Sequence, residues 1–306
     1  MRYVDLNCDL GESFGPYRLG NDEAVLAYVT SANVACGMHA GDPLVMRKTV
    51  QLCRERGVAV GAHPGYPDLW GFGRRALPMT PDEVYAFLLA QVGALEAVAR
   101  AEGVRLQHVK PHGALYNVAA RDEATAAAVA EAVRRAWPEA ILVVLSGSTS
   151  ERVARGLGVR VAREAFCDRG YRRDGSLVPR DQPGAVLTEP FEVASRAVRI
   201  AHGEPIETVD GVGGVDIYGG RQRQINVYLD INKLNAYNLS AQDVERAAIG
   251  PGGVAGQGLA WLELVRLRAA TKALWGAGYD IRGFHDAVLA PGALPLSMLR
   301  GRLLGS

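Results

Sequence analysis

The chain has 306 residues, of which 48% are hydrophobic and 22% charged, a composition typical of a globular protein with a sizeable core. Lysine and arginine (34) nearly balance aspartate and glutamate (33), which leaves a net charge of +1. This balance predicts neither nucleic acid nor anionic lipid as a partner. No unbroken apolar run approaches the roughly 18 residues of a spanning helix, so we also expect no membrane partner.

The N-terminus and the cysteines predict a cytoplasmic protein. Asp5 and Asp9 interrupt the stretch in which a signal peptide would need an apolar run. The four cysteines form neither a C-x-x-C pair nor a dense framework and are expected to be reduced thiols: Cys8, Cys36, Cys53 and Cys167.

Strand and helix patterns alternate through the first 200 residues. Runs rich in β-branched and apolar residues predict strands at 3–10, 32–36, 58–63, 106–112, 141–145 and 159–166. Apolar residues at helical spacing predict helices between and after these strands, at 22–29, 43–56, 81–103, 123–135, 149–157 and 191–201. Strands separated by helices pair in parallel, which predicts either a (β/α) barrel or a doubly wound open sheet.

The ends of the predicted strands favour the barrel. Polar or Gly-rich clusters follow five of the six strands, at 9–12, 37–39, 63–66, 110–113 and 168–171. In a barrel all carboxyl ends surround one mouth, whereas an open sheet collects such residues from a few strands only. We therefore expect side chains distant in sequence to converge at one opening.

The pattern changes near residue 211. Gly-rich segments occupy 212–220 and 250–258, with one predicted strand at 225–231 between them. A polar helix is predicted at 240–248 and an amphipathic one at 261–275. We predict a catalytic barrel domain over 1–211 and an atypical, mainly helical tail over 212–306.

The first strand is unusually acidic. Alternation places Asp5, Asn7 and Asp9 on one face, where burial without a purpose would be costly. Asp9 and Glu12, at the strand's end, are candidates for a general base or for holding a water molecule. The alternative is that one acid only braces neighbouring loops.

Four histidines lie at or near strand ends: His39, His63, His108 and His112. They suit acid–base catalysis, because imidazole titrates near neutral pH, and they equally suit metal ligation beside an aspartate. The sequence leaves both uses open. His108 lies deeper in its strand, so a supporting role is expected for it.

Cations accompany these groups. Lys110, at a strand end, is a candidate for binding phosphate or stabilising an oxyanion, the alternative being a lysine that extends to solvent. Arg74 and Arg75 belong to a predicted loop over the mouth, and we expect at most one of them to be functional. The sequence has no GxxxxGK[ST] phosphate loop. Cys36 is interpreted as a small buried residue rather than a nucleophile.

Five motifs carry a resemblance to a known family. In order they are DLNCDLGESFG (5–15), SANVACGMHAGDP (31–43), VGAHPGYPDLWGFGRR (60–75), VKPHGALYN (109–117) and EAFCDRGYRRDGSLVPR (164–180). Over residues 1 to about 210 the chain resembles the LamB/YcsF family. The resemblance implies a barrel of the glycoside hydrolase/deacetylase type. It also implies opening of the lactam of 5-oxo-L-proline to L-glutamate with ATP as co-substrate, alongside separate B and C subunits.

That reaction suggests roles for the candidate residues. Asp9 and Glu12 would orient water, His63 or His112 would shuttle a proton, and Lys110 would lie near the phosphate. The expected substrate contacts are Asn7, His39, Arg74, Tyr116 and Arg169. The alternative enzyme is a metal-dependent, deacetylase-like amidohydrolase with Asp9, His39, His63 and His112 as ligands of a divalent metal. A non-catalytic chimera whose tail mediates assembly is the third hypothesis.

The tail departs from the family pattern. The resemblance implies a last strand and a Cys-x-His-Gly-Asp type motif after residue 211, and this chain lacks the motif. Residues 219–247 instead resemble part of a resistance–nodulation–division efflux pump, and 256–303 resemble an uncharacterised helical hydrolase-like family. We interpret the tail as a graft without transport function. The barrel is then expected to be incomplete at its last strand unless 225–231 fills the position, and activity to be impaired if the missing residues bind substrate.

Overall fold

A computed structural model describes residues 4–208, 214–215 and 225–228. The chain divides into two compact units, Met1–Glu245 and Arg246–Ser306, and all described residues belong to the first. The boundary predicted at residue 211 and the helices predicted in the tail lie outside the described residues.

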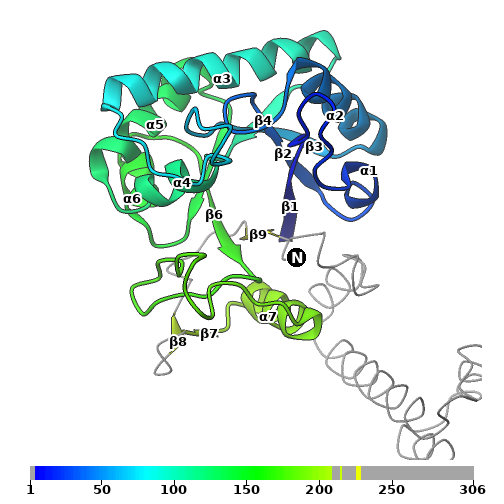
Figure 1. The fold of residues 1–306 in the computed structure, drawn as a ribbon. Helices are drawn as coiled ribbons and strands as arrows, with labels where there is room; N and C mark the ends of the chain where they lie inside the picture. Colours follow the sequence, from blue (N-terminus) through cyan, green and yellow to red (C-terminus); the bar gives the residue numbers. More distant parts are fainter. Residues whose placement is uncertain (1–3, 209–213, 216–224, 229–306) are drawn as a thin grey trace, which may run out of the picture. The chain divides into compact units, whose positions relative to one another are not determined.

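Seven of the described strands form a closed parallel barrel (Figure 1). Six strands pair in chain order: β1 (Val4–Leu10), β2 (Ser31–Ala35), β3 (Ala59–His63), β4 (Leu106–Val109), β5 (Ile141–Leu145) and β6 (Val161–Phe166). A short strand, β9 (Ile225–Tyr228), pairs in parallel with both β1 and β6. The predicted barrel is confirmed. The gap expected at its last strand is filled by β9, within the segment 225–231 that alternation had indicated.

Helices connect the strands and surround the barrel. They are α1 (Asp22–Val25), α2 (Pro43–Arg56), α3 (Pro81–Ala101), α4 (Gly113–Ala119), α5 (Glu123–Ala136), α6 (Thr149–Gly156) and α7 (Pro190–His202). Sequence periodicity missed α4, because its seven residues follow directly on the polar motif that ends β4. It also missed two short antiparallel strands, β7 (Ile206–Glu207) and β8 (Gly214–Val215).

The longest helix, α3, begins where the sequence predicts it. Thr80 and Glu83 form a reciprocal capping box, and Pro81 occupies the first turn, where its missing N–H costs nothing. Although the sequence has no unbroken apolar run of that size, α3 has the length and mean hydropathy of a membrane-spanning helix. In this fold its buried face, with Val84, Leu88 and Leu95, belongs to the hydrophobic core around the barrel.

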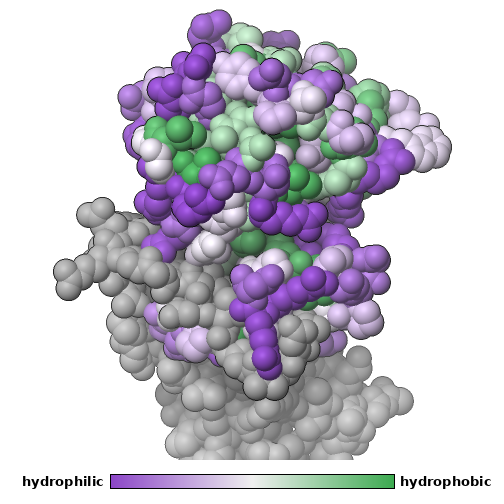
Figure 2. Space-filling model, turned by 90° about the vertical axis from the view of Figure 1, so that its left-hand side faces the viewer, coloured by the Kyte–Doolittle hydropathy of each residue, from purple (hydrophilic) through white to green (hydrophobic). Residues whose placement is uncertain are grey.

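The helices on the left of Figure 1 present charged groups outward. On α5, Arg134 and Arg135 both pair with Glu131, and on α6, Arg155 pairs with Glu151 one turn away. Hydrophilic residues accordingly cover much of this face, with hydrophobic ones gathered in limited patches (Figure 2).

Replacing Gly61 tests how tightly the barrel interior is filled. A Cβ at Gly61 would overlap the imidazole of His108, whereas a Cβ at Gly93, in α3, meets nothing within 4 Å. We expect Gly61→Ala to lower the free energy of unfolding by about 1–3 kcal/mol, the usual cost of overpacking. Gly93→Ala should leave it unchanged or raise it by up to about 1 kcal/mol.

Urea or guanidinium unfolding of the two variants beside the parent chain measures both effects. Equal stabilities for Gly61→Ala and Gly93→Ala would contradict the packing described for β3 and β4.

Candidate active site at the barrel mouth

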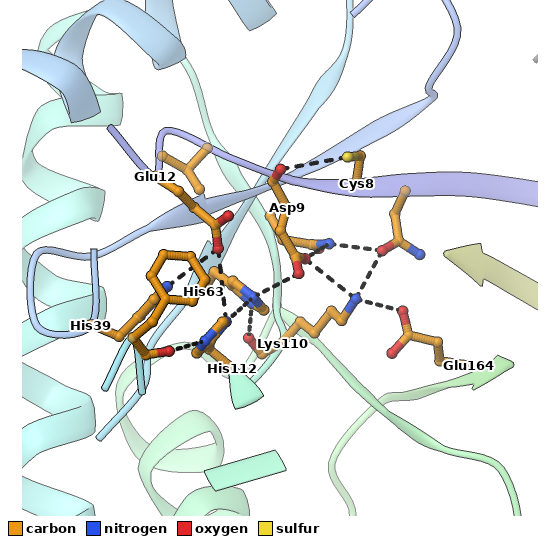
Figure 3. A network of polar contacts seen from close by, with 12 residues as sticks. Cys8, Asp9, Glu12, His39, His63, Lys110, His112 and Glu164 are labelled. Carbon is orange, nitrogen blue, oxygen red and sulfur yellow. Dashed lines mark hydrogen bonds and ion pairs between the residues drawn. The ribbon is translucent and has the colours of Figure 1, made fainter. Parts of the chain in front are cut away.

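The predicted catalytic residues converge at one end of the barrel. Asp9 lies on β1, and Glu12 follows that strand. His63 ends β3, while Lys110 and His112 come directly after β4. Because the carboxyl ends of parallel barrel strands share one mouth, these side chains meet although 103 positions separate the first from the last. Figure 3 shows them pointing toward one another.

The carboxylate of Asp9 occupies the centre of the cluster. Its Oδ2 lies 3.2 Å from Nε2 of His63, and its Oδ1 lies 3.5 Å from Nζ of Lys110. Nδ2 of Asn33 donates a hydrogen bond of 2.9 Å to the same Oδ1. Burial by itself would raise the pKa of Asp9, but His63 and Lys110 hold that pKa well below its ordinary value. Asp9 is therefore an ionised carboxylate at neutral pH.

Lys110 is a buried cation held by two carboxylates. Its Nζ lies 2.7 Å from Oε1 of Glu164, on β6, and donates to Oδ1 of Asn7 at 3.1 Å. Burial opposes the charged form, but Asp9 and Glu164 raise the pKa of Lys110 above its ordinary value. Sequence reasoning did not select Glu164. A carboxylate two positions before the end of a predicted strand, directly after Arg163, was the available signal.

Backbone carbonyls fix the orientation of two imidazole rings. Nδ1 of His63 lies 2.7 Å from the carbonyl oxygen of Lys110, and Nε2 of His112 lies 2.8 Å from that of Phe72. A carbonyl only accepts hydrogen bonds, so each of these nitrogens carries the proton. The remaining nitrogens, Nε2 of His63 and Nδ1 of His112, face each other at 3.0 Å.

His39 stacks on His112 at the rear of the cluster. The two rings are parallel within 3°, with centroids 3.7 Å apart. Burial and the neighbouring histidines lower the pKa of His39 far below its ordinary value, and burial, followed by His63, lowers that of His112 to about 3. Both rings are therefore neutral at neutral pH, which is the form in which an imidazole binds a metal ion.

Glu12 completes a cluster that could hold a metal ion. Its Oε1 lies 3.6 Å from Nε2 of His39 and 3.9 Å from Nδ1 of His112. Burial, reinforced by the charge of Asp9, raises the pKa of Glu12 to about 8. One ligand atom from each of Glu12, His39, His63 and His112 lies within 4.8 Å of the others. The sequence predicted Asp9 as the carboxylate of a metal site; the carboxylate of this cluster is Glu12, and Asp9 lies beside it at 3.2 Å from His63.

The loop after β3 covers the two stacked histidines. Phe72 has a φ of 55°, unusual for a bulky residue, and its ring meets both His39 and His112 edge-on. Asp68 holds the loop by accepting from the Gly71 amide and pairing with Arg75. Arg75 is therefore a loop-bracing residue, while Arg74 borders the cavity with its guanidinium over the Phe72 ring.

A cavity of about 780 Å³ opens at this mouth. It is bordered by all five predicted catalytic residues: Asp9, Glu12, His63, Lys110 and His112. Of the residues predicted to bind substrate, Arg74, Tyr116 and Arg169 also border it.

Two predicted substrate contacts lie elsewhere, and a third has other partners. Asn7 does not border the cavity, because its Oδ1 is turned to Lys110 and Asn33 in the barrel interior. His39 also stays outside the cavity lining, since it stacks against His112. The Arg169 guanidinium donates to the carbonyls of Val178 and Ala185, so it fixes a loop.

His108 and Cys36 occupy supporting positions. Nε2 of His108 lies 2.7 Å from Oδ1 of Asn33, the residue that also contacts Asp9, and His108 does not line the cavity. Burial raises the pKa of the Cys36 thiol to about 12, which leaves it a poor nucleophile. Both observations agree with the interpretation of these residues from sequence.

A carboxylate, a cluster of histidines and a buried lysine at the mouth of a parallel (β/α) barrel are the arrangement of an enzyme active site of the barrel class. A family model described as the LamB/YcsF family matches residues 4–217, and the chain belongs to that family. The chain is 54% identical over 211 residues to the A-type subunit of 5-oxoprolinase from Geobacillus kaustophilus, covering 69% of this chain and 82% of the relative. It is 51% identical over 237 residues to the corresponding 5-oxoprolinase subunit of Pyrococcus horikoshii, covering 76% and 93%.

A solved structure shares the fold. The crystal structure of Lactam Utilization Protein from Thermus thermophilus is 46% identical and superposes with a TM-score of 0.70, covering 81% of this chain and 94% of that one. A second family model, described as the AcrB/AcrD/AcrF family, matches residues 193–258 and so includes the segment 219–247 that resembles an efflux pump. The resemblance of residues 256–303 to a helical hydrolase-like family stays a prediction, as does the interpretation of the tail as a graft.

Removing the buried lysine should expose the cost of an unpaired carboxylate. Burial already raises the pKa of Glu164 although Lys110 opposes this effect. In Lys110→Met the pKa of Glu164 must rise further in the folded state, while its pKa in the unfolded state stays near the ordinary value. We therefore expect destabilisation of about 3 kcal/mol at pH 8. The loss should shrink below about pH 4, where Glu164 is protonated in both states.

The matched control is Lys48→Met, which removes an exposed pair with Glu23 and should change stability by less than about 0.5 kcal/mol. Denaturant unfolding at several pH values measures both variants. A pH-independent loss in Lys110→Met would contradict the role given to Glu164.

Proposed function

We propose that this chain is a hydrolase that opens the lactam of 5-oxo-L-proline to L-glutamate, coupled to ATP hydrolysis. It would act in the cytoplasm as the A-type subunit beside separate B and C subunits. The names of its relatives support the substrate and the division of the enzyme into subunits. The observation that carries the proposal is an ionised Asp9 between His63 and Lys110 at the edge of a substrate-sized cavity.

The chemistry explains why ATP would be needed. A five-membered lactam is a resonance-stabilised amide and a poor electrophile. Transfer of the γ-phosphoryl group to the lactam oxygen gives ADP and an imidate-like phosphate. One water adds to the carbonyl carbon and the ring C–N bond breaks, with a proton passing to nitrogen. A second water replaces the phosphate, so that glutamate and inorganic phosphate are released.

The residues at the mouth suit these steps. Asp9 is ionised and borders the cavity, so it can take a proton from the attacking water and return it to the leaving nitrogen. The Lys110 ammonium group, 3.5 Å from Asp9, would stabilise negative charge on the lactam oxygen or its phosphate. Arg74 and Tyr116, which also border the cavity, are available to bind the substrate.

The assay is ATP-dependent glutamate release from 5-oxoproline by the full chain, with and without the B and C subunits. We expect release that depends on ATP and on the partner subunits. Asp9→Asn should lower kcat/KM at least about 100-fold, the scale of a lost general base.

Asp5→Asn is the matched control. Asp5 lies on the same strand, but it accepts hydrogen bonds from the hydroxyls of Thr30 and Ser31 and does not border the cavity. Its substitution should leave kcat/KM within about threefold, as expected for a residue outside the site. Absence of glutamate release by the complete assembly, or full activity of Asp9→Asn, would refute the proposed function.

A further inference from the structure

Four side chains at the rear of the mouth place their donor atoms at the spacing of metal ligands. Nε2 of His63 and Nδ1 of His112 are 3.0 Å apart, and Oε1 of Glu12 lies 3.6 Å from Nε2 of His39 and 3.9 Å from Nδ1 of His112 (Figure 3). With bonds of about 2.0–2.1 Å, the ligands of a tetrahedral zinc ion lie about 3.3 Å from one another. These three distances bracket that value, and all four ligand atoms lie within 4.8 Å of one another.

Two of these nitrogens face each other at a short distance. The far nitrogens of His63 and His112 carry their protons, because each donates to a backbone carbonyl, of Lys110 and Phe72 respectively. When both rings are neutral, the near nitrogens have no proton to place between them at 3.0 Å. Two lone pairs at that distance repel, so the pair requires a positive charge, either a proton on Nε2 of His63, which lies 3.2 Å from Oδ2 of Asp9, or a metal ion. A ring whose far N–H is held by a carbonyl is also the usual arrangement of a metal-ligating histidine.

Buried polar atoms without partners point to the same place. Both ring nitrogens of His39 and Oε1 of Glu12 are buried and make no hydrogen bond within the part of the chain that the structure describes. His39 is only 1% exposed, so water does not satisfy it from outside. An unpaired buried polar group is costly, and a bound cation would satisfy a nitrogen of His39 and the Glu12 oxygen at once.

We infer that Glu12, His39, His63 and His112 form a binding site for one divalent transition-metal ion of the zinc type. Three imidazole nitrogens with a single carboxylate oxygen favour zinc and its neighbours over magnesium or calcium, which prefer oxygen ligands. Glu12, His63 and His112 border the cavity, so such an ion would face the bound substrate.

This inference goes beyond the proposed function. Ligation would replace the proton-shuttle role that the sequence suggested for His63 and His112. Asp9, 3.2 Å from Nε2 of His63, would remain beside the ion as the base.

Direct titration of the full chain with Zn²⁺ tests the site without substrate or partner subunits. After removal of metal with a chelator, calorimetry should give saturable binding of one zinc ion per chain, and Mg²⁺ should not compete. Glu12→Gln, which keeps the side-chain shape, and His39→Ala should each weaken zinc binding about tenfold or more. Circular dichroism melting should show that each variant is folded.

The matched control is His202→Ala. His202 is a partly exposed histidine at the end of α7, outside the cluster, and its removal should leave zinc affinity unchanged. The inference is overturned if the parent chain binds no stoichiometric zinc, or if folded Glu12→Gln and His39→Ala both keep the parent affinity. Because this readout needs no turnover, a failed lactam assay would refute the proposed function alone.

Discussion

The buried ammonium group of Lys110 ties the strands of the barrel mouth together. Its Nζ reaches Asn7 and Asp9 on β1 and Glu164 on β6, while its own carbonyl oxygen accepts from His63 at the end of β3. A buried cation of this kind is stable only when carboxylates compensate its desolvation. In return its charge helps to keep Asp9 ionised despite burial. The Lys110 ammonium group thus both connects the strands at the barrel mouth and helps to keep Asp9 ionised as a base.

The loop after β3 packs over the histidines of the cluster. The backbone of Gly73 approaches the rings so closely that a Cβ there would lie 2.7 Å from Cβ of His39 and 2.8 Å from Cδ2 of His112. Phe72, held at positive φ, supplies the carbonyl that fixes His112. A backbone conformation of this kind costs of order 1–3 kcal/mol and persists where surrounding contacts enforce it. Here those contacts are made by Asp68. The loop therefore acts as the orienting element of the cluster.

The sequence predicted the parts of the site that follow from strand topology. Asp9, His63 and Lys110 sit at strand ends, and parallel pairing alone brings strand ends together. It did not predict contacts made across the barrel interior or through main-chain atoms. Glu164 was missed because its partner lies 54 positions away, and the part of Phe72 was missed because a carbonyl oxygen leaves no mark in a residue pattern. Asn7 was predicted to contact the substrate. Strand alternation predicts the face on which its side chain lies, but it does not predict which residues that side chain contacts.

The charge on Lys110 can be measured directly. Heteronuclear NMR of the lysine side chains, assigned by comparison with Lys110→Met, follows the protonation of its Nζ with pH. The carboxylates of Asp9 and Glu164 raise the pKa of Lys110 above its ordinary value of 10.5, so the group should remain protonated through pH 10. Titration of Lys110 near neutral pH would contradict this account, because an uncharged amine would neither hold Glu164 nor keep Asp9 ionised.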